Sequence, residues 1–204
     1  MSFWSRKGAV PDELPPLPYE PSSPEGLAAR WVQWVAASGP VKNPIDDATG
    51  EHAAENQPDD VWFLAGTYGK RHERKCFVPA GRDLFLPVVN MWFYPADGAP
   101  EAEELALLRE HGSASLLIDG VVQELEEIAT PVPFVVAGAR LNGVTNSKKP
   151  TPTTVRGLWK RVPALPPGEH TLWSVGALGD GFTVDVTYRL LVAPTPAVSY
   201  PSVT

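Results

Sequence analysis

The sequence contains little of what usually identifies a function: cysteine, closely spaced histidines and surplus positive charge. Cys76 is the single cysteine among 204 residues, so a disulfide within the chain is excluded. The 4 histidines lie far apart, without the His-x-His or His-Glu-x-x-His spacing of metal sites. The net charge is −7, and basic residues never occur in runs longer than two. Binding to the phosphates of a nucleic acid is therefore not expected.

Long apolar runs and the common catalytic motifs are also missing. No window approaches the ~18 apolar residues of a membrane span. Pro11 and Asp12 stand where a secretory signal would have its apolar segment. Together with the single cysteine, this predicts a cytoplasmic protein without membrane contact. The sequence has no Gly-x-Ser-x-Gly elbow, phosphate-binding loop or dinucleotide fingerprint, so nucleophilic and nucleotide chemistry lack support and no cofactor is expected.

By contrast, proline and glycine are abundant, with 23 and 17 residues. Because proline interrupts helices, this composition favours short strands joined by turns. The most apolar stretches, residues 61–69 and 76–90, are divided by glycine and proline into pieces of strand length. We predict an all-β fold, an antiparallel β-sandwich of the jelly-roll or immunoglobulin-like type.

Two helices are predicted beside the strands. Ser23-Pro24-Glu25 is typical of a helix start, and apolar residues follow at helical spacing up to Gly39-Pro40. This predicts an amphipathic helix over residues 24–38, with Trp31 and Trp34 as core anchors. A short acidic helix is predicted near residues 100–111. Residues 140–156 are expected to form a long loop. The predicted strands cover residues 61–64, 76–78, 84–94, 134–136, 158–162, 168–175 and 182–192, with an Asp-Gly hairpin over 115–122.

Both ends of the sequence are rich in proline. Residues 1–22 have no apolar period and are predicted to be an extended, polyproline-like arm. Residues 194–204 are predicted to be a proline-containing tail, which leaves residues 23–193 as a single sandwich domain. Such arms suit contacts with a neighbouring subunit, so a homo-oligomer is expected.

The loop between the first helix and the first strand carries the candidate metal ligands. Asp46, Asp47, Glu51 and His52 lie close together in it, and clustered carboxylates can hold Ca²⁺ or, with histidine, a first-row transition metal. The spacing does not match an EF-hand. A solvated acidic loop is the alternative interpretation, because runs of charge usually cover a surface.

Tryptophan is the other candidate, with 7 residues in the chain. Trp4 lies in the predicted arm, and Trp159 and Trp173 lie near predicted turns, so these three are expected outside the core. Exposed aromatic rings can stack on a carbohydrate or contact a protein partner. Cys76 is expected to be a buried, inert thiol. His170, which enters a strand after Pro-Pro-Gly, is expected to be a structural hydrogen-bonding group.

Two blocks of the sequence have a distinctive pattern. They consist of Trp31-x-x-Trp34, Asn43-Pro44, Asp47-x-Thr49-Gly50, Gln57, Val61-Trp62-Phe63-Leu64-Ala65-Gly66, Cys76-x-Val78-Pro79-Ala80-Gly81-x-x-Leu84-Phe85-x-Pro87-Val88-x-Asn90, Leu165-Pro166-Pro167-Gly168-Glu169-His170-Thr171-Leu172 and Phe182-x-Val184-Asp185-Val186-Thr187-Tyr188. This pattern resembles a group of uncharacterised bacterial proteins, many of them secreted, and the resemblance implies a β-sandwich and no activity.

Secreted members of the group tend to have a second cysteine shortly after a Thr-Gly pair, which would bridge to the position of Cys76. This chain has Glu51-His52-Ala53-Ala54 there and departs from the pattern, which agrees with an intracellular version of the fold.

Two functions remain open from the sequence. The first is a non-catalytic binding or assembly module that forms homo-oligomeric contacts through its proline-rich arms and has a protein or carbohydrate ligand. The alternative is a metal-dependent β-sandwich enzyme that assembles its site from the acidic loop and some of the histidines, which are His52, His72, His111 and His170.

Overall fold

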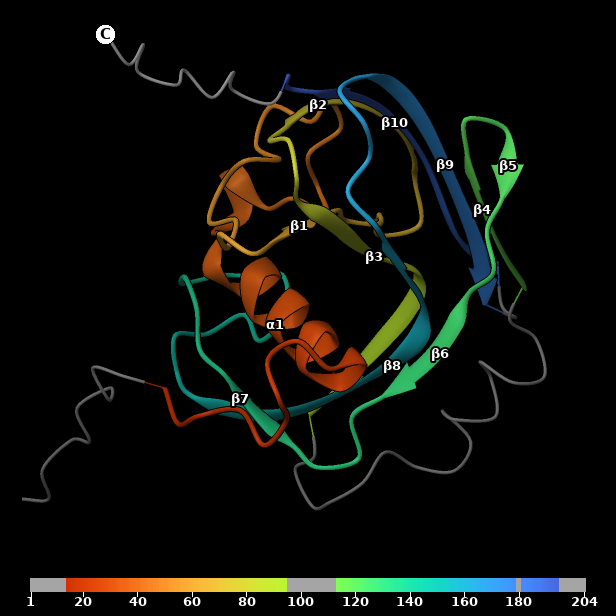
Figure 1. Cartoon of the computed structure of the whole chain (residues 1–204). Helices are drawn as coiled ribbons and strands as arrows, with labels where there is room; N and C mark the ends of the chain where they lie inside the picture. Colours follow the sequence, from red (N-terminus) through yellow and green to blue (C-terminus); the bar gives the residue numbers. More distant parts are fainter. Residues whose placement is uncertain (1–13, 95–112, 179–180, 195–204) are drawn as a thin grey trace, which may run out of the picture.

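Two five-stranded β-sheets and one α-helix make up the part of the chain that the computed structural model describes, residues 14–94, 113–178 and 181–194 (Figure 1). The predicted short helix near residues 100–111 lies outside these ranges. In chain order the elements are α1 Pro24–Ala37, the 3₁₀ helix η1 Pro40–Lys42, β1 Val61–Phe63, β2 Arg71–Val78, β3 Asp83–Phe93, β4 Ser113–Ile118, β5 Val121–Val122, β6 Glu126–Ala129, β7 Phe134–Val136, β8 Thr151–Val162, β9 Gly168–Leu178 and β10 Phe182–Val192.

The strands form a sandwich-like arrangement of two sheets, as predicted. Sheet A has the order β1-β3-β8-β6, with β7 also paired to β8, and sheet B has the order β2-β10-β9-β4-β5. The prediction of a wholly antiparallel sandwich is wrong, because β1 runs parallel to β3 and β2 runs parallel to β10. Parallel neighbours need a crossover connection, and the chain between β1 and β3 passes through β2 in the other sheet.

Sheet A is covered on both faces. One face packs on α1 in a core that includes Phe63, Phe85 and Trp159, and the other packs on sheet B in a second core that includes Leu84 and Leu86. Figure 1 shows α1 lying in the hollow of the curled sheet A, on the side away from sheet B. A strand buried on both faces has no polar side to present, which explains the unbroken apolar run at β1.

The helix α1 starts and ends as its sequence predicts. The Ser23 hydroxyl accepts a hydrogen bond from the Gly26 backbone N–H, and the helix extends from Pro24 to Ala37. The indole N–H of Trp31 donates to the Leu64 carbonyl at 2.9 Å, so the helix is fixed directly to the chain after β1. Trp31 is 1% exposed, and truncating so large a buried side chain typically costs about 3–5 kcal/mol. In the described residues, no helix combines the length and apolar character needed to cross a bilayer.

Strand β3 contains a bulge, and strand β8 is longer than predicted. Pro87 lies in β3 next to a shift of register with β8, which agrees with the bulge that a proline in a strand predicts. The predicted loop over residues 140–156 is wrong at its end, because β8 begins at Thr151. The polar Thr-Pro-Thr-Thr segment extends as a strand because β7 pairs with residues 151–153 and β3 pairs with Thr154.

The last residues of the predicted N-terminal arm pack on the domain. Leu17 contacts the core beneath α1. The Tyr19 hydroxyl donates to the Val132 carbonyl at 2.6 Å and accepts from the Val132 N–H at 2.7 Å. The chain at Glu20 approaches α1 so closely that a Cβ on Gly26 would lie 2.0 Å from the Glu20 carbonyl oxygen. Residues 1–13 and 195–204 lie outside the described part of the chain.

Candidate functional site

The outer face of sheet B is the candidate functional site. Its strands alternate between buried residues facing sheet A and exposed ones facing solvent. The strand predicted over residues 76–78 begins earlier, at Arg71, so β2, the edge strand of sheet B, places every second side chain of its charged segment on this face. The outward positions that carry the argument are Arg71, Glu73, Lys75 and Phe77 on β2, Asp185, Thr187, Arg189 and Leu191 on β10, and Glu169, Thr171 and Trp173 on β9.

Four charged side chains on this face are paired with one another. The Arg71 Nε lies 3.6 Å from an Asp185 carboxylate oxygen, and the Arg189 Nε lies 2.5 Å from a Glu73 oxygen. The hydrogen bond from Arg189 lowers the pKa of the Glu73 carboxyl, and the same contact raises the pKa of Arg189. Because these pairs are exposed to solvent, they contribute little to stability. Their effect is to make this part of the face neutral overall.

Trp173 lies across the sheet beside these pairs. Its indole N–H donates to an Asp185 carboxylate oxygen at 3.0 Å, and its side chain is on β9 while Asp185 is on β10. Trp173 is 39% exposed. The expectation that this tryptophan lies outside the core is confirmed, and the bond to Asp185 holds the indole in one orientation.

A groove of about 390 Å³ crosses β2, β10 and β9 on the same face. Lys75, Arg189 and Thr171 form one bank, and Phe77, Leu191 and Glu169 form the other, as the strand register requires. Phe77 is 77% exposed and Leu191 is 40% exposed, and the two residues pair across neighbouring strands. The groove therefore combines an apolar corner with a polar, basic bank.

His170 lies at one end of the groove and is structural, as expected. Its Nδ1 lies 2.7 Å from an Asp119 carboxylate oxygen and its Nε2 lies 2.9 Å from the Pro166 carbonyl. Asp119 also accepts a hydrogen bond from the Thr171 backbone N–H. The hydrogen bond to Asp119 raises the pKa of His170, and the Pro166 carbonyl adds to the effect, because both acceptors favour the doubly protonated ring. This ring connects the β4–β5 turn to β9.

The predicted metal ligands do not converge. The Asp47 carboxylate accepts from the backbone N–H groups of Thr49, Gly50 and His52 at 2.8–3.0 Å, so it organises its own loop. Burial works to raise the pKa of Asp47, but these hydrogen bonds outweigh it and hold the pKa below the usual value. Asp46 and Glu51 point to solvent. Within the described residues no three His, Cys, Asp or Glu side chains are arranged to hold a metal ion. His111 lies outside those residues.

The burial of Trp159 and Cys76 tests two further predictions. Trp159 is fully buried, so the expectation that it lies outside the core is wrong. The reason is that β8 runs from Thr151 to Val162 and places Trp159 in mid-strand, stacked on Phe85 with ring centroids 5.2 Å apart. Cys76 is buried, and burial raises the pKa of its thiol to about 12, which agrees with an inert cysteine. Trp4 lies outside the described residues.

A buried arginine is the main feature that the sequence interpretation missed. Arg74 is 1% exposed, and its guanidinium donates to the backbone carbonyls of Ile45, Asp47 and Ala65 and to the Tyr188 hydroxyl. Among the described carboxylates, none forms an ion pair with it. Arg74 alternates in phase with Cys76 and Val78, and this pattern was the available signal. Its role is to tie the 45–47 loop to β2 and β10.

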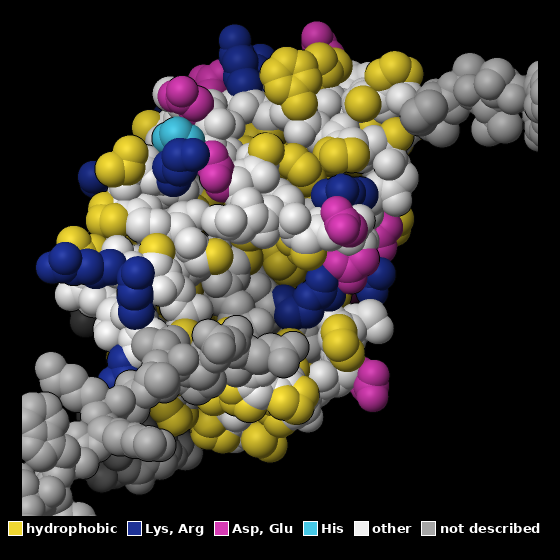
Figure 2. All heavy atoms as spheres, turned by 90° about the vertical axis from the view of Figure 1, so that its left-hand side faces the viewer, with side chains coloured by type: hydrophobic (Ala, Val, Ile, Leu, Met, Phe, Trp, Pro, Cys, Tyr) yellow, Lys and Arg dark blue, Asp and Glu magenta, His cyan; other side chains and the backbone are white. Residues whose placement is uncertain are grey.

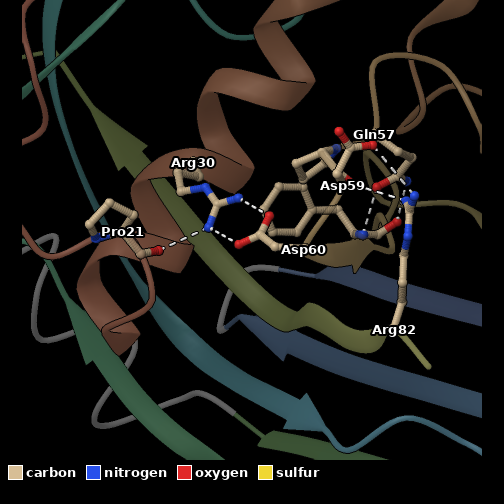
Figure 3. A network of polar contacts seen from close by, with 8 residues as sticks. Pro21, Arg30, Gln57, Asp59, Asp60 and Arg82 are labelled. Atoms are coloured by element: carbon tan, nitrogen blue, oxygen red, sulfur yellow. Dashed lines mark hydrogen bonds and ion pairs between the residues drawn. The ribbon is translucent and has the colours of Figure 1, made fainter.

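A second polar network joins α1 to the segment just before β1 (Figure 3). Arg30 of α1 forms a two-bond ion pair with Asp60 and donates to the Pro21 carbonyl. The Gln57 side chain bonds both backbone groups of Phe63 and thereby occupies the open edge of β1. Figure 2, in which the left-hand side of Figure 1 faces the viewer, shows acidic and basic side chains interspersed among hydrophobic ones. These hydrogen bonds and ion pairs hold α1 and the segment before β1 in place, which is a structural role.

Comparisons with known proteins leave the family open. No protein-family model matches the chain, and no curated protein matches it either. The resemblance to secreted bacterial β-sandwich proteins therefore stays a prediction.

Proposed function

We propose that this chain is a non-catalytic binding or assembly module whose contact surface is the outer face of sheet B. The observation that carries the proposal is the difference between the sheets. Sheet A is covered on one face by α1 and on the other by sheet B, whereas the outer face of sheet B carries the exposed side chains of Phe77, Leu191 and Trp173. A folded domain rarely leaves such apolar groups together without a use.

The size of this face approaches that of a specific contact. Its strands β2, β10, β9, β4 and β5 have 8, 11, 11, 6 and 2 residues. At ~3.3 Å per residue and ~4.8 Å between strands, the sheet presents roughly 600 Å². A stable protein interface buries about 800 Å² on each partner. We further propose that residues 1–13 and 195–204 extend this contact to another copy of the chain, giving a homo-oligomer.

The strand order supports an immunoglobulin-like rather than a jelly-roll sandwich. In immunoglobulin-type domains one sheet has the order A-B-E-D and the other the order G-F-C, extended by C′ in variable-type domains. Here β1-β3-β8-β6 takes the first order and β10-β9-β4-β5 the second. The parallel pairing of β1 with β3 is a departure. On this proposal the outer face of sheet B is the face of the G-F-C-C′ strands.

Native mass spectrometry of charge-insertion variants tests the assembly proposal. The double variant Phe77→Glu with Leu191→Glu places two carboxylates in the apolar corner and is expected to convert a discrete oligomer into a monomer. The matched control is Val41→Glu, because Val41 is 85% exposed and lies on η1, away from sheet B. If the wild type and the double variant have the same number of subunits, assembly through this face is contradicted.

Deletion of the end segments tests their contribution separately. Removing residues 1–13 is preferable to removing residues 1–22, because Leu17 and Tyr19 contact the domain and their loss would also weaken the fold. We expect deletion of residues 1–13 and 195–204 to reduce the oligomer mass beyond the mass of the deleted residues. An oligomer with an unchanged number of subunits would argue against the arms. For the alternative of a metal-dependent enzyme, no group of three His, Cys, Asp or Glu side chains among the described residues is arranged to hold the metal ion.

A further inference from the structure

We propose that Trp173 is the stacking platform of a site for an uncharged sugar ring on the outer face of sheet B. This inference rests on the proposed function, since it assigns a ligand class to the same face. It is distinct from the apolar corner at Phe77 and Leu191, which lies two rows along the strands from Trp173.

The first support is the fixed orientation of the indole. The Trp173 N–H donates to Asp185 on the neighbouring strand at 3.0 Å, and Asp185 is itself held by Arg71, whose Nε lies 3.6 Å away. A side chain tethered at its far end to the next strand lies over the sheet rather than standing away from it. The exposed 39% of Trp173 is then presented to solvent without free rotation. A preoriented ring loses little entropy when a flat ligand stacks on it.

The second support is the polar surroundings of the ring. Thr187 lies beside Trp173 on β10, and Glu73 lies beside Thr187 on β2. With a strand spacing of ~4.8 Å, these side chains stand within about 10 Å of the indole, which is the reach of a sugar ring and its hydroxyls. Hydroxyl groups both donate and accept, so they can use carboxylate, guanidinium and threonine groups together.

The third support is charge. The four ionic groups next to Trp173 are two arginines and two carboxylates, and they are paired as Arg71 with Asp185 and Arg189 with Glu73. An anionic or cationic ligand gains no net attraction from such a surface. A neutral, hydroxyl-rich ligand does not depend on net charge and can form hydrogen bonds with the paired groups.

The test is titration of the full-length protein with neutral oligosaccharides of known linkage, namely cellohexaose, maltohexaose, xylohexaose and laminarihexaose. Isothermal titration calorimetry and tryptophan fluorescence both report binding. We expect at least one of the four to bind saturably, with a dissociation constant of about 1 mM or below. Trp173→Ala is expected to weaken that binding at least ~10-fold and Trp173→Phe less, because stacking depends on the aromatic ring.

Phe182→Ala is the matched control, since Phe182 is an aromatic residue that is 38% exposed, nearly as much as Trp173, and lies at the start of β10 in phase with the core-facing Val184. It is expected to bind the sugar as the wild type does. Asp185→Ala frees the indole without removing it and is expected to give an intermediate loss, which keeps the test informative if Trp173→Ala folds poorly by circular dichroism. Absence of binding to all four sugars, or equal binding by the wild type and Trp173→Ala, overturns the inference.

The outcome for the sugar site is separable from the outcome for the proposed function. If no sugar binds but Phe77→Glu with Leu191→Glu still dissociates an oligomer, the platform is refuted and the assembly face stands. If Trp173→Ala changes the oligomer mass rather than sugar binding, a second copy occupies the ring and the inference fails. If no sugar binds to the wild type and neither Trp173→Ala nor Phe77→Glu with Leu191→Glu changes the oligomer mass, the proposed function of this face fails as well.

Discussion

Replacing Arg74 with methionine is expected to lower the free energy of unfolding by about 2–4 kcal/mol. The guanidinium donates to the Ile45 carbonyl at 2.9 Å, to the Ala65 carbonyl at 2.8 Å, to the Tyr188 hydroxyl at 2.7 Å and to the Asp47 carbonyl. Within the described residues the carbonyls of Ile45 and Asp47 receive no other hydrogen bond. Methionine fills the space and leaves both carbonyls unpaired.

The magnitude follows from these losses. Each buried carbonyl left without a donor costs about 1–3 kcal/mol, which gives about 2–6 kcal/mol for two. Relief from burying a positive charge offsets part of this cost. Arg74→Lys keeps the charge but has fewer donors in a different geometry, so we expect it to lose about 1–3 kcal/mol.

Equilibrium unfolding in urea, followed by tryptophan fluorescence, measures the effect. Lys75→Met is the matched control, because Lys75 is the next residue on β2 and is exposed, so its loss should stay within about 0.5 kcal/mol. Tyr188→Phe completes a double-mutant cycle, and the contact between the two side chains predicts a coupling of at least ~0.5 kcal/mol. Arg74→Met with the stability of the wild type would refute the assigned role.

Three further predictions concern other parts of the fold. His170→Asn should lower the free energy of unfolding by about 1 kcal/mol near pH 6 and by less at pH 8. The raised pKa of His170 contributes stability that is fully present below about pH 6.5 and is lost as the pH rises through the pKa of the folded state. An equal loss of unfolding free energy at both pH values, measured by urea titration, would contradict the role of the hydrogen bond between His170 and Asp119. Gly138→Ala should lower the free energy of unfolding by about 1–3 kcal/mol, because its Cβ would lie 1.9 Å from the Ala36 carbonyl oxygen. Gly39→Ala is the control and should be tolerated in the same thermal melts, since the atom nearest to its Cβ would be 3.7 Å away. Cys76 should react with iodoacetamide at least ~100-fold more slowly in native protein than in urea-unfolded protein, because burial raises its pKa to about 12, and comparable mass-spectrometric labelling rates would refute this.

The sequence by itself determined the elements whose start or turn depends on adjacent residues. Ser23 and Pro24 start α1 because a hydroxyl cap and a fixed φ act on the adjacent turn. The Asp119-Gly120 pair closes the β4–β5 hairpin because both residues adopt a positive φ. The alternation along β10 places Val184, Val186, Tyr188 and Leu190 on the core side, whereas Phe182, which has the same phase, is 38% exposed at the start of the strand.

The tertiary structure decided which surfaces are covered and which polar groups are buried. Arg74 is buried because β2 pairs with β10, and it bonds Tyr188 across a separation of 114 residues. Trp159 is buried because β8 extends through Thr151 and α1 covers that face of sheet A. The outer face of sheet B brings Trp173, Asp185 and Arg71 together from three strands. Pairing of distant strands creates each of these contacts, and no short segment of the chain contains the information that specifies them.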